Sequence, residues 1–188
     1  MQNDFVTGSL GSSEAKNIVQ NVKEHITRRY RDNFEIIFTR DTHNINYLNT
    51  LEGQYLPVEH CIEGTNGWQI VKGLETPHCH YINKNTFGWL NWNYRNLNNG
   101  SIVPYTSKYD YIEVIGVCTD ICVISNALIL RSMFPNTRIC VISDCCAGTS
   151  PEQHTSALNV MRSCQIDVIN TGVLMEQQGK YNTKISTK

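Results

Sequence analysis

The chain has 188 residues, 40% of them hydrophobic, which is enough for one domain to close a core without disulfides. Sixteen lysines and arginines nearly balance 17 aspartates and glutamates, so the formal net charge of −1 excludes the strongly basic surface used to bind nucleic acid or anionic membranes. No stretch approaches the roughly 20 apolar residues of a membrane span, and the first residues lack the pattern of a signal peptide. We therefore expect a cytoplasmic protein, with no nucleic-acid or membrane partner, that acts on a small molecule.

Segments with strand-like and helix-like patterns alternate along the chain. Apolar residues at three- and four-residue spacing indicate helices, and short apolar runs rich in β-branched residues indicate strands. Such alternation predicts a mostly parallel sheet covered by helices. In chain order we expect a helix over 13–31, a strand over 34–39, a strand over 111–117, a helix that ends near 133–135, a strand over 138–143, a helix from 150 to about 164 and a strand over 166–169.

Two further segments are irregular. The segment from about 44 to 107 is rich in Asn, Gly, Trp and Tyr, and at that length it must form folded loops and short elements, which commonly build a site. Residues 177–188 form a polar, aperiodic tail that we expect to fray. The domain prediction is thus a single domain over 1–176 followed by this tail.

The eight cysteines point to thiols rather than to disulfides. Several of them lie in apolar runs of a chain without an export signal, and buried thiols mostly behave as small hydrophobic residues. Only Cys122 has a context that suggests chemistry.

That context is the segment Gly116-Val117-Cys118-Thr119-Asp120-Ile121-Cys122-Val123, which follows a strand and leads into a helix. Unpaired amides and the positive end of the helix dipole at such a place are expected to lower the pKa of a thiol. The same amides can stabilise an oxyanion on an attacked carbonyl. Cys122 is therefore a candidate nucleophile.

This segment resembles the nucleophile motif of the isochorismatase-like cysteine hydrolases, in which the second cysteine attacks. The resemblance implies a cis peptide between Val117 and Cys118, and an oxyanion hole formed by the amides of Cys118 and Cys122. It implies an isochorismatase-like (Rossmann-like) α/β fold, a three-layer α-β-α sandwich with strand order 3-2-1-4-5-6. The family's catalytic lysine follows a short strand upstream of the nucleophile, and Lys84 occupies that place. Its charge would favour the Cys122 thiolate.

A third group of residues suggests a metal site. Asp41 and His43 lie two apart at the end of the strand expected over 34–39, so their side chains point to the same side. Carboxylates and neutral imidazoles are ligands for Zn, Mn or Fe. The wider pattern resembles the metal site of nicotinamidases, and the resemblance implies a divalent ion bound by Asp41, His43, Glu52 and His60, with Glu52 the least certain match.

The metal pattern favours the nicotinamidase branch, because other branches of the family do not generally carry this ion. The resemblance then implies hydrolysis of nicotinamide to nicotinate and ammonia through a Cys122 thioester, a reaction of NAD salvage. Phe5 occupies the place of an aromatic residue that packs on the substrate ring, and Tyr47 and Trp68 are further candidates for the pocket. Members of the family are often oligomeric, so the resemblance also implies a homo-oligomer.

The departure from the family pattern lies at the first residue. The family's catalytic aspartate would sit one residue before Met1, at the end of the first, central strand, and both are missing from the chain as given. Asp4 matches a different family position. We expect that the natural protein carries about ten more residues and is an ordinary enzyme; the competing explanation is a truncated, inactive protein.

Three functions remain open at this point. They are a nicotinamidase, a related hydrolase of another small amide or carbamoyl group, and a remnant that only binds a metal or ligand. Bound metal separates the first from the second, and ammonia release separates both from the third. The run His78-Cys79-His80 also looks metal-like, but we interpret it as structural because Cys79 points away from the two histidines on a strand.

Overall fold

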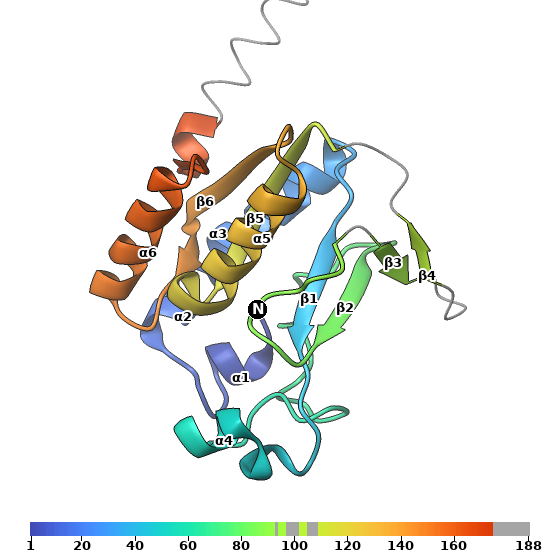
Figure 1. Ribbon diagram of the computed structural model, residues 1–188, viewed down its shortest axis with the longest axis vertical. Coiled ribbons are helices and arrows are strands. Elements are labelled where there is room, and N and C mark those ends of the chain that lie inside the picture. The colour runs from blue at the N-terminus through green and yellow to red at the C-terminus, as the bar shows by residue number, and fades with distance from the viewer. Residues whose placement is uncertain (93, 97–101, 105–108, 175–188) are drawn as a thin grey trace, which may run out of the picture.

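The computed structural model describes residues 1–92, 94–96, 102–104 and 109–174. Parallel strands with helices on both faces form its centre, which confirms the expected α/β sandwich (Figure 1). The expected tail over 177–188 lies outside the described residues.

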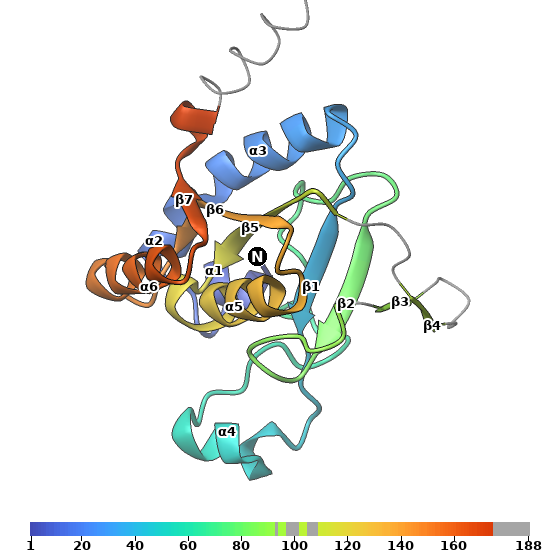
Figure 2. The same cartoon turned by 45° about the horizontal axis from the view of Figure 1, so that its top comes forward.

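One parallel sheet contains three strands in the order β5-β6-β7. Its residues alternate between two cores: Cys140 and Ile142 of β6 face the core beneath α3, whereas Ile139 and Val141 face the core beneath α5 and α6. Figure 2 shows α3 on one side of this sheet and α5 and α6 on the other. Burial on both faces explains why β6 is a nearly continuous apolar run. The elements of this half are α3 (Val19–Arg31), β5 (Tyr111–Val117), α5 (Ile124–Met133), β6 (Arg138–Ala147), α6 (Pro151–Ser163) and β7 (Asp167–Ile169).

A second parallel sheet pairs β1 with β2, from Ile37 opposite His80 to Asp41 opposite Lys84. η1 and α4 lie between the two strands in the chain, at one end of the molecule (Figure 1). The remaining elements of the chain are α1 (Asn3–Val6), α2 (Ser13–Asn17), β1 (Ile37–Asp41), η1 (Tyr47–Asn49), α4 (Leu51–Tyr55), β2 (His80–Lys84) and the antiparallel pair β3 (Tyr94–Asn96) and β4 (Ile102–Pro104).

The two parallel sheets run in the same direction. At their amino-terminal ends the rings of Phe34 and Tyr111 meet edge to face with centroids 6.3 Å apart, and at their carboxyl ends Lys84 approaches Cys122. Within the described residues, no strand pairs with both β1 and β5, and these two strands belong to separate sheets.

Three boundaries differ from the sequence predictions. The helix expected over 13–31 is interrupted at Ile18, which ends α2 and begins α3 with φ −90° and ψ −8°. β1 starts at Ile37 rather than at residue 34, because its pairing with β2 begins there. β6 continues to Ala147 because its last residues pair with Gly116 and Val117 beyond a register shift in β5. Pairing with another strand sets the limits of β1 and β6, and a local sequence pattern does not reveal that pairing.

Candidate active site and metal centre

Cys122 lies where β5 ends and the chain turns into α5. The turn Thr119–Val123 is wound as a π-helix, a form that often occurs at functional sites, rather than as the first turn of an ordinary α-helix. Inside it the amides of Ile121 and Val123 both donate to the carbonyl of Cys118, each at 3.1 Å. The peptide between Val117 and Cys118 is cis, as the resemblance implied.

Side chains outside the nucleophile motif hold this turn. The buried Thr119 hydroxyl lies 2.8 Å from Nδ1 of His154 on α6. Asp120 accepts hydrogen bonds from the amide and the hydroxyl of Thr149, the former at 2.9 Å. Both contacts tie the turn to the start of α6, so the helix that follows β6 helps to position the nucleophile.

Asn126 is a site residue that our sequence reasoning missed. It is buried on α5, and its Nδ2 donates to the Cys122 carbonyl at 2.7 Å and to the Phe87 carbonyl at 3.1 Å, while its Oδ1 accepts from the Trp89 amide at 2.9 Å. It thus joins the nucleophile turn to the loop after Lys84. Its position four residues after Cys122, on the same helix face, is the only signal the sequence offered.

Lys84 lies between Cys122 and the carboxylate of Asp41. It ends β2, is 3% exposed, and its Nζ lies 3.8 Å from Cys122 Sγ and 3.5 Å from Asp41 Oδ1. Nζ also donates to the Thr86 carbonyl at 2.9 Å. A buried ammonium group needs such partners, and a carboxylate, a main-chain carbonyl and a thiol fall within its reach here.

The pKa of the Cys122 thiol is shifted in the opposite direction from the one that the sequence suggested. Burial raises the pKa of Cys122, and the Lys84 ammonium lowers it without cancelling the effect of burial. The expectation of a lowered thiol pKa was therefore wrong for this protein, because desolvation of the charged form outweighs the attraction of one cation. A base must take the proton when the thiol attacks.

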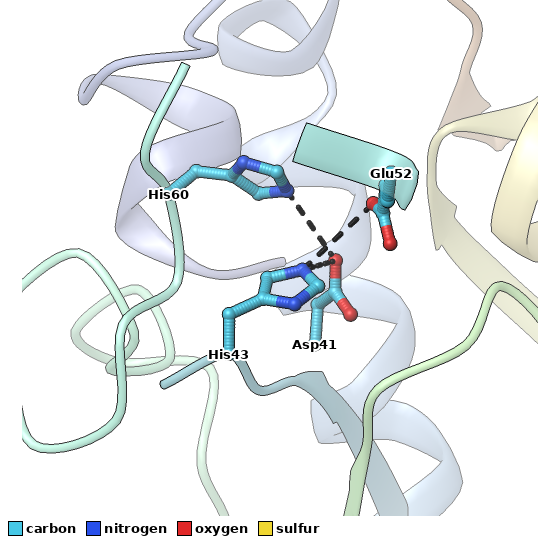
Figure 3. Close-up of side chains that lie close together, drawn as sticks. All are labelled: Asp41, His43, Glu52 and His60. Atoms are coloured by element: carbon cyan, nitrogen blue, oxygen red, sulfur yellow. Dashed lines mark hydrogen bonds and ion pairs between the residues drawn. The ribbon is translucent and has the colours of Figure 1, made fainter. Parts of the chain in front are cut away.

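Asp41, His43, Glu52 and His60 come together from three parts of the chain (Figure 3). His43 Nε2 lies 3.3 Å from Asp41 Oδ2 and 3.8 Å from Glu52 Oε1, and His60 Nε2 lies 3.6 Å from Asp41 Oδ2. One ligand atom of each residue lies within 4.8 Å of every other. Two ligands of one zinc ion are roughly 3.4 Å apart in tetrahedral geometry, so the four side chains are spaced to share an ion.

The hydrogen bonds around the cluster also favour binding of a metal ion. Nδ1 of His60 donates to the Val58 carbonyl at 2.8 Å, which orients the ring so that Nε2 faces Asp41. Burial would raise the pKa of Asp41, yet hydrogen bonds from His43 and His60 hold it well below its usual range. Asp41 is therefore a carboxylate, and the donor set of two imidazoles and two carboxylates suits zinc, manganese or iron.

The cluster depends on a short strand-like extension of β1. Beyond Asp41, the His43 amide donates to the Cys61 carbonyl at 3.0 Å, and the Glu63 amide donates to the His43 carbonyl at 2.8 Å. The carboxylate of Asp4 accepts a hydrogen bond from the Cys61 amide at 2.7 Å, so Asp4 holds the loop that carries His60. Among the described residues no other group of His, Cys, Asp and Glu converges in this way, and His78, Cys79 and His80 do not.

The three aromatic residues expected in the pocket lie in different places. Phe5 meets His60 edge to face at 5.7 Å and lines a cavity of about 270 Å³ that also touches Cys122, Lys84 and Asp41. Tyr47 is fully buried behind the cluster and donates to the Leu56 carbonyl at 3.0 Å. Trp68 stacks under the Arg40 guanidinium at 3.9 Å. Tyr47 and Trp68 do not line this cavity.

Helices long and apolar enough to cross a membrane are absent from the described part of the chain. No curated protein sequence matches the chain. Solved structures do. Nicotinamidase from Bacillus subtilis superposes with a TM-score of 0.74 at 20% identity, over 90% of this chain and 94% of that one.

Two further structures extend the range of relatives. Pyrazinamidase of Pyrococcus horikoshii, solved in complex with zinc, gives a TM-score of 0.71 at 27% identity over 90% and 94% of the two chains. N-carbamoylsarcosine amidase from Thermoplasma acidophilum gives 0.66 at 21% identity over 90% and 91%. The model of the isochorismatase domain matches residues 1–172, nearly the whole described chain. The chain therefore belongs to the isochorismatase family of hydrolases.

Proposed function

We propose that the protein is a metal-dependent cysteine amidohydrolase that converts nicotinamide to nicotinate and ammonia. One observation carries the proposal: Lys84 lies 3.8 Å from the candidate nucleophile Cys122 and 3.5 Å from Asp41, whose second oxygen belongs to the metal-ligand cluster. Nucleophile and cluster are thus within reach of one small substrate. The nicotinamidase and pyrazinamidase neighbours support this substrate class.

The residues of the chain suggest how the reaction proceeds. The Cys122 thiolate attacks the carboxamide carbon, a C–S bond forms, and the amides of Cys118 and Cys122 donate to the oxyanion. Collapse of this intermediate breaks the C–N bond and releases ammonia, which carries away the thiol proton. Water then hydrolyses the thioester and regenerates Cys122. Lys84 stabilises the thiolate before it attacks and again when the thioester is hydrolysed.

The base that takes and returns the proton is assigned by the resemblance alone. Asp41 is not assigned this role, because two histidines and Lys84 already hold its carboxylate.

The metal has a defined place in this proposal. Asp41, His43, Glu52 and His60 would hold a divalent ion, and when bound it supplies a Lewis acid that can fix the ring nitrogen of a pyridine carboxamide. Phe5, which contacts His60, would pack on the same ring. These residues orient the substrate, whereas Cys122 and Lys84 carry out the chemistry.

The test is ammonia release from nicotinamide by the protein. Cys122→Ala should lower the rate by about a thousandfold or more, because the nucleophile is lost. Cys164→Ala removes an exposed thiol and should leave the rate unchanged. Equal rates for the two variants would refute the thioester mechanism.

A second function is another amide or carbamoyl hydrolysis, which the N-carbamoylsarcosine amidase neighbour favours. Metal content separates the two. If the active protein releases ammonia from N-carbamoylsarcosine but not from nicotinamide, and contains no bound divalent metal, the second function replaces the first.

A further inference from the structure

His60 reaches the metal-ligand cluster from an irregular loop rather than from a helix or a strand (Figure 3). A ligand on a loop is held less precisely than one on a regular element, so it needs an anchor. The bond from its Nδ1 to the Val58 carbonyl orients the ring, but Val58 belongs to the same loop. What fixes the loop itself is bonded to the next residue, Cys61.

The main chain of Cys61 is bonded on both sides. Its carbonyl accepts from the His43 amide at 3.0 Å, and its amide donates to Asp4 Oδ2 at 2.7 Å. Its φ of +47° lies in the left-handed region, which residues other than glycine rarely adopt, and the residue is fully buried. Such a conformation persists only where the surroundings hold it. The Asp4 carboxylate therefore supplies one of the two bonds that hold the backbone beside His60.

Two glycines make room for the Asp4 carboxylate. A Cβ on Gly67 would lie 2.1 Å from Asp4 Oδ2, and a Cβ on Gly8 would lie 2.2 Å from Oδ1. Neither glycine has a positive φ, so the close approach of the carboxylate is what requires glycine at both positions. Two main-chain bonds hold α1 against the same loop segment: the Asn3 amide donates to Gln69 at 2.9 Å, and the Asp4 amide donates to Gly67 at 3.0 Å.

The next residue of α1 also touches the ligand. The ring of Phe5 meets the ring of His60 edge to face at 5.7 Å, and Phe5 lines the cavity that reaches Cys122. Asp4 thus contacts the backbone beside His60, while Phe5 contacts its ring. A shift of α1 would therefore displace the ligand and one wall of the cavity together.

We propose that Asp4 is a positioning residue of the metal centre, whose carboxylate fixes the Cys61 amide and so preorganises His60 for a divalent ion. This proposal rests on the proposed function, in which the cluster holds that ion. Asp4 is not part of the cluster of ligand atoms, so it acts through the loop and not on the ion. Without this anchor the ion must also order the loop when it binds, and the loss of a partner that orients a ligand commonly weakens metal binding by about 10–100-fold.

The test is the zinc dissociation constant of the metal-free protein, measured by competition with a chromophoric chelator. Asp4→Ala should weaken zinc binding by about tenfold or more. Asp4→Asn removes the charge but keeps one oxygen that can accept from Cys61, so it should recover most of the loss and separate the hydrogen bond from the charge. Asp110→Ala removes an exposed carboxylate and should leave the affinity unchanged.

A double-mutant cycle separates positioning of His60 from a general effect on the fold. In a His60→Ala background, Asp4→Ala should change the zinc affinity by less than about twofold, because its target is already lost. In a Glu52→Gln background it should keep its full effect, since Glu52 comes from α4, a separate segment. Equal losses in the two backgrounds would overturn the proposal.

Gly67→Ala tests the same anchor without altering Asp4 or any ligand. Its Cβ would displace the Asp4 carboxylate, so the zinc affinity should fall as in Asp4→Ala, whereas Gly172→Ala, whose Cβ meets only one side-chain oxygen at 3.3 Å, should bind normally. Parental affinity in both Asp4→Ala and Gly67→Ala would overturn the role of Asp4 and leave the metal site standing. A parent protein that binds neither zinc, manganese nor ferrous iron would refute the metal site itself and this role with it.

Discussion

The chemistry of Cys122 depends on two opposing effects at a single sulfur. Burial raises the pKa of the thiol, and the ammonium group of Lys84, 3.8 Å away, lowers it. Since burial dominates, the free protein keeps the thiol protonated to a higher pH than an exposed cysteine would, and the charge of Lys84 determines how far.

Removal of that charge should shift the reaction of the thiol to higher pH. Lys84→Gln removes the largest effect that offsets burial, so the pKa of Cys122 rises further and the pH at which iodoacetamide alkylation reaches half its maximum moves up. Mass spectrometry of the Cys122 peptide after timed alkylation measures this. Lys72→Gln, which changes an exposed lysine, should leave the profile in place. A Lys84→Gln profile that matches the parent would exclude Lys84 from thiolate stabilisation.

At the scale of elements, the site is assembled where strand ends meet short connections. Asp41 ends β1, Lys84 ends β2 and Cys122 follows β5, as expected for a parallel α/β fold in which sites form at the carboxyl ends of strands. The amino-terminal segment joins this edge through Gln2, whose side-chain amide bonds the main chain of Asp41 and also donates to the Trp68 carbonyl at 2.9 Å. Gln2 thus links three segments that are distant in sequence.

Loss of the Gln2 amide should destabilise the protein. Gln2→Ala leaves the buried amide and carbonyl of Asp41 and the carbonyl of Trp68 without this partner, which should cost about 2–4 kcal/mol in urea unfolding. Gln20→Ala, on the exposed face of α3, should change stability by less than about 0.5 kcal/mol. Equal unfolding midpoints for the two variants would show that Gln2 does not hold the β1 edge.

For the molecule as a whole, the metal-ligand cluster joins β1 to the long segment between β1 and β2. Asp41 belongs to β1, Glu52 to α4 and His60 to the loop that follows, so an ion at this place would cross-link residues that only loops connect. Any ligand that binds the folded state alone stabilises it by mass action.

Addition of zinc to metal-free protein should therefore raise the melting temperature. At a hundredfold excess over the dissociation constant the gain is about 2.7 kcal/mol, which corresponds to a rise of roughly 5–10 °C for a chain of this size. His60→Ala should abolish most of this rise, whereas His78→Ala, outside the cluster, should retain it. Differential scanning calorimetry with and without a chelator measures both. A full zinc response in His60→Ala would contradict the assignment of His60 as a ligand.

The sequence by itself determined the features that are written in contiguous residues. The segment from Gly116 to Cys122 and the spacing of Asp41 and His43 identified the candidate nucleophile and the beginning of the metal cluster, because a strand end and an alternating strand place side chains in known directions. The helix over 150–164 was predicted nearly to its ends, since Ser150 and Pro151 are local start signals.

Only the tertiary structure decided what depends on residues far apart in the chain. Three contacts are of this kind: Glu52 with His43, Asn126 with the loop after Lys84, and Gln2 with Asp41. Each joins segments that no periodic pattern in the sequence relates to one another. The pKa of Cys122 depends on how deeply the folded protein buries it, so the helix end suggested one direction and burial produced the other. Local patterns specify the elements, whereas the balance between desolvation and charge exists only once the elements have packed.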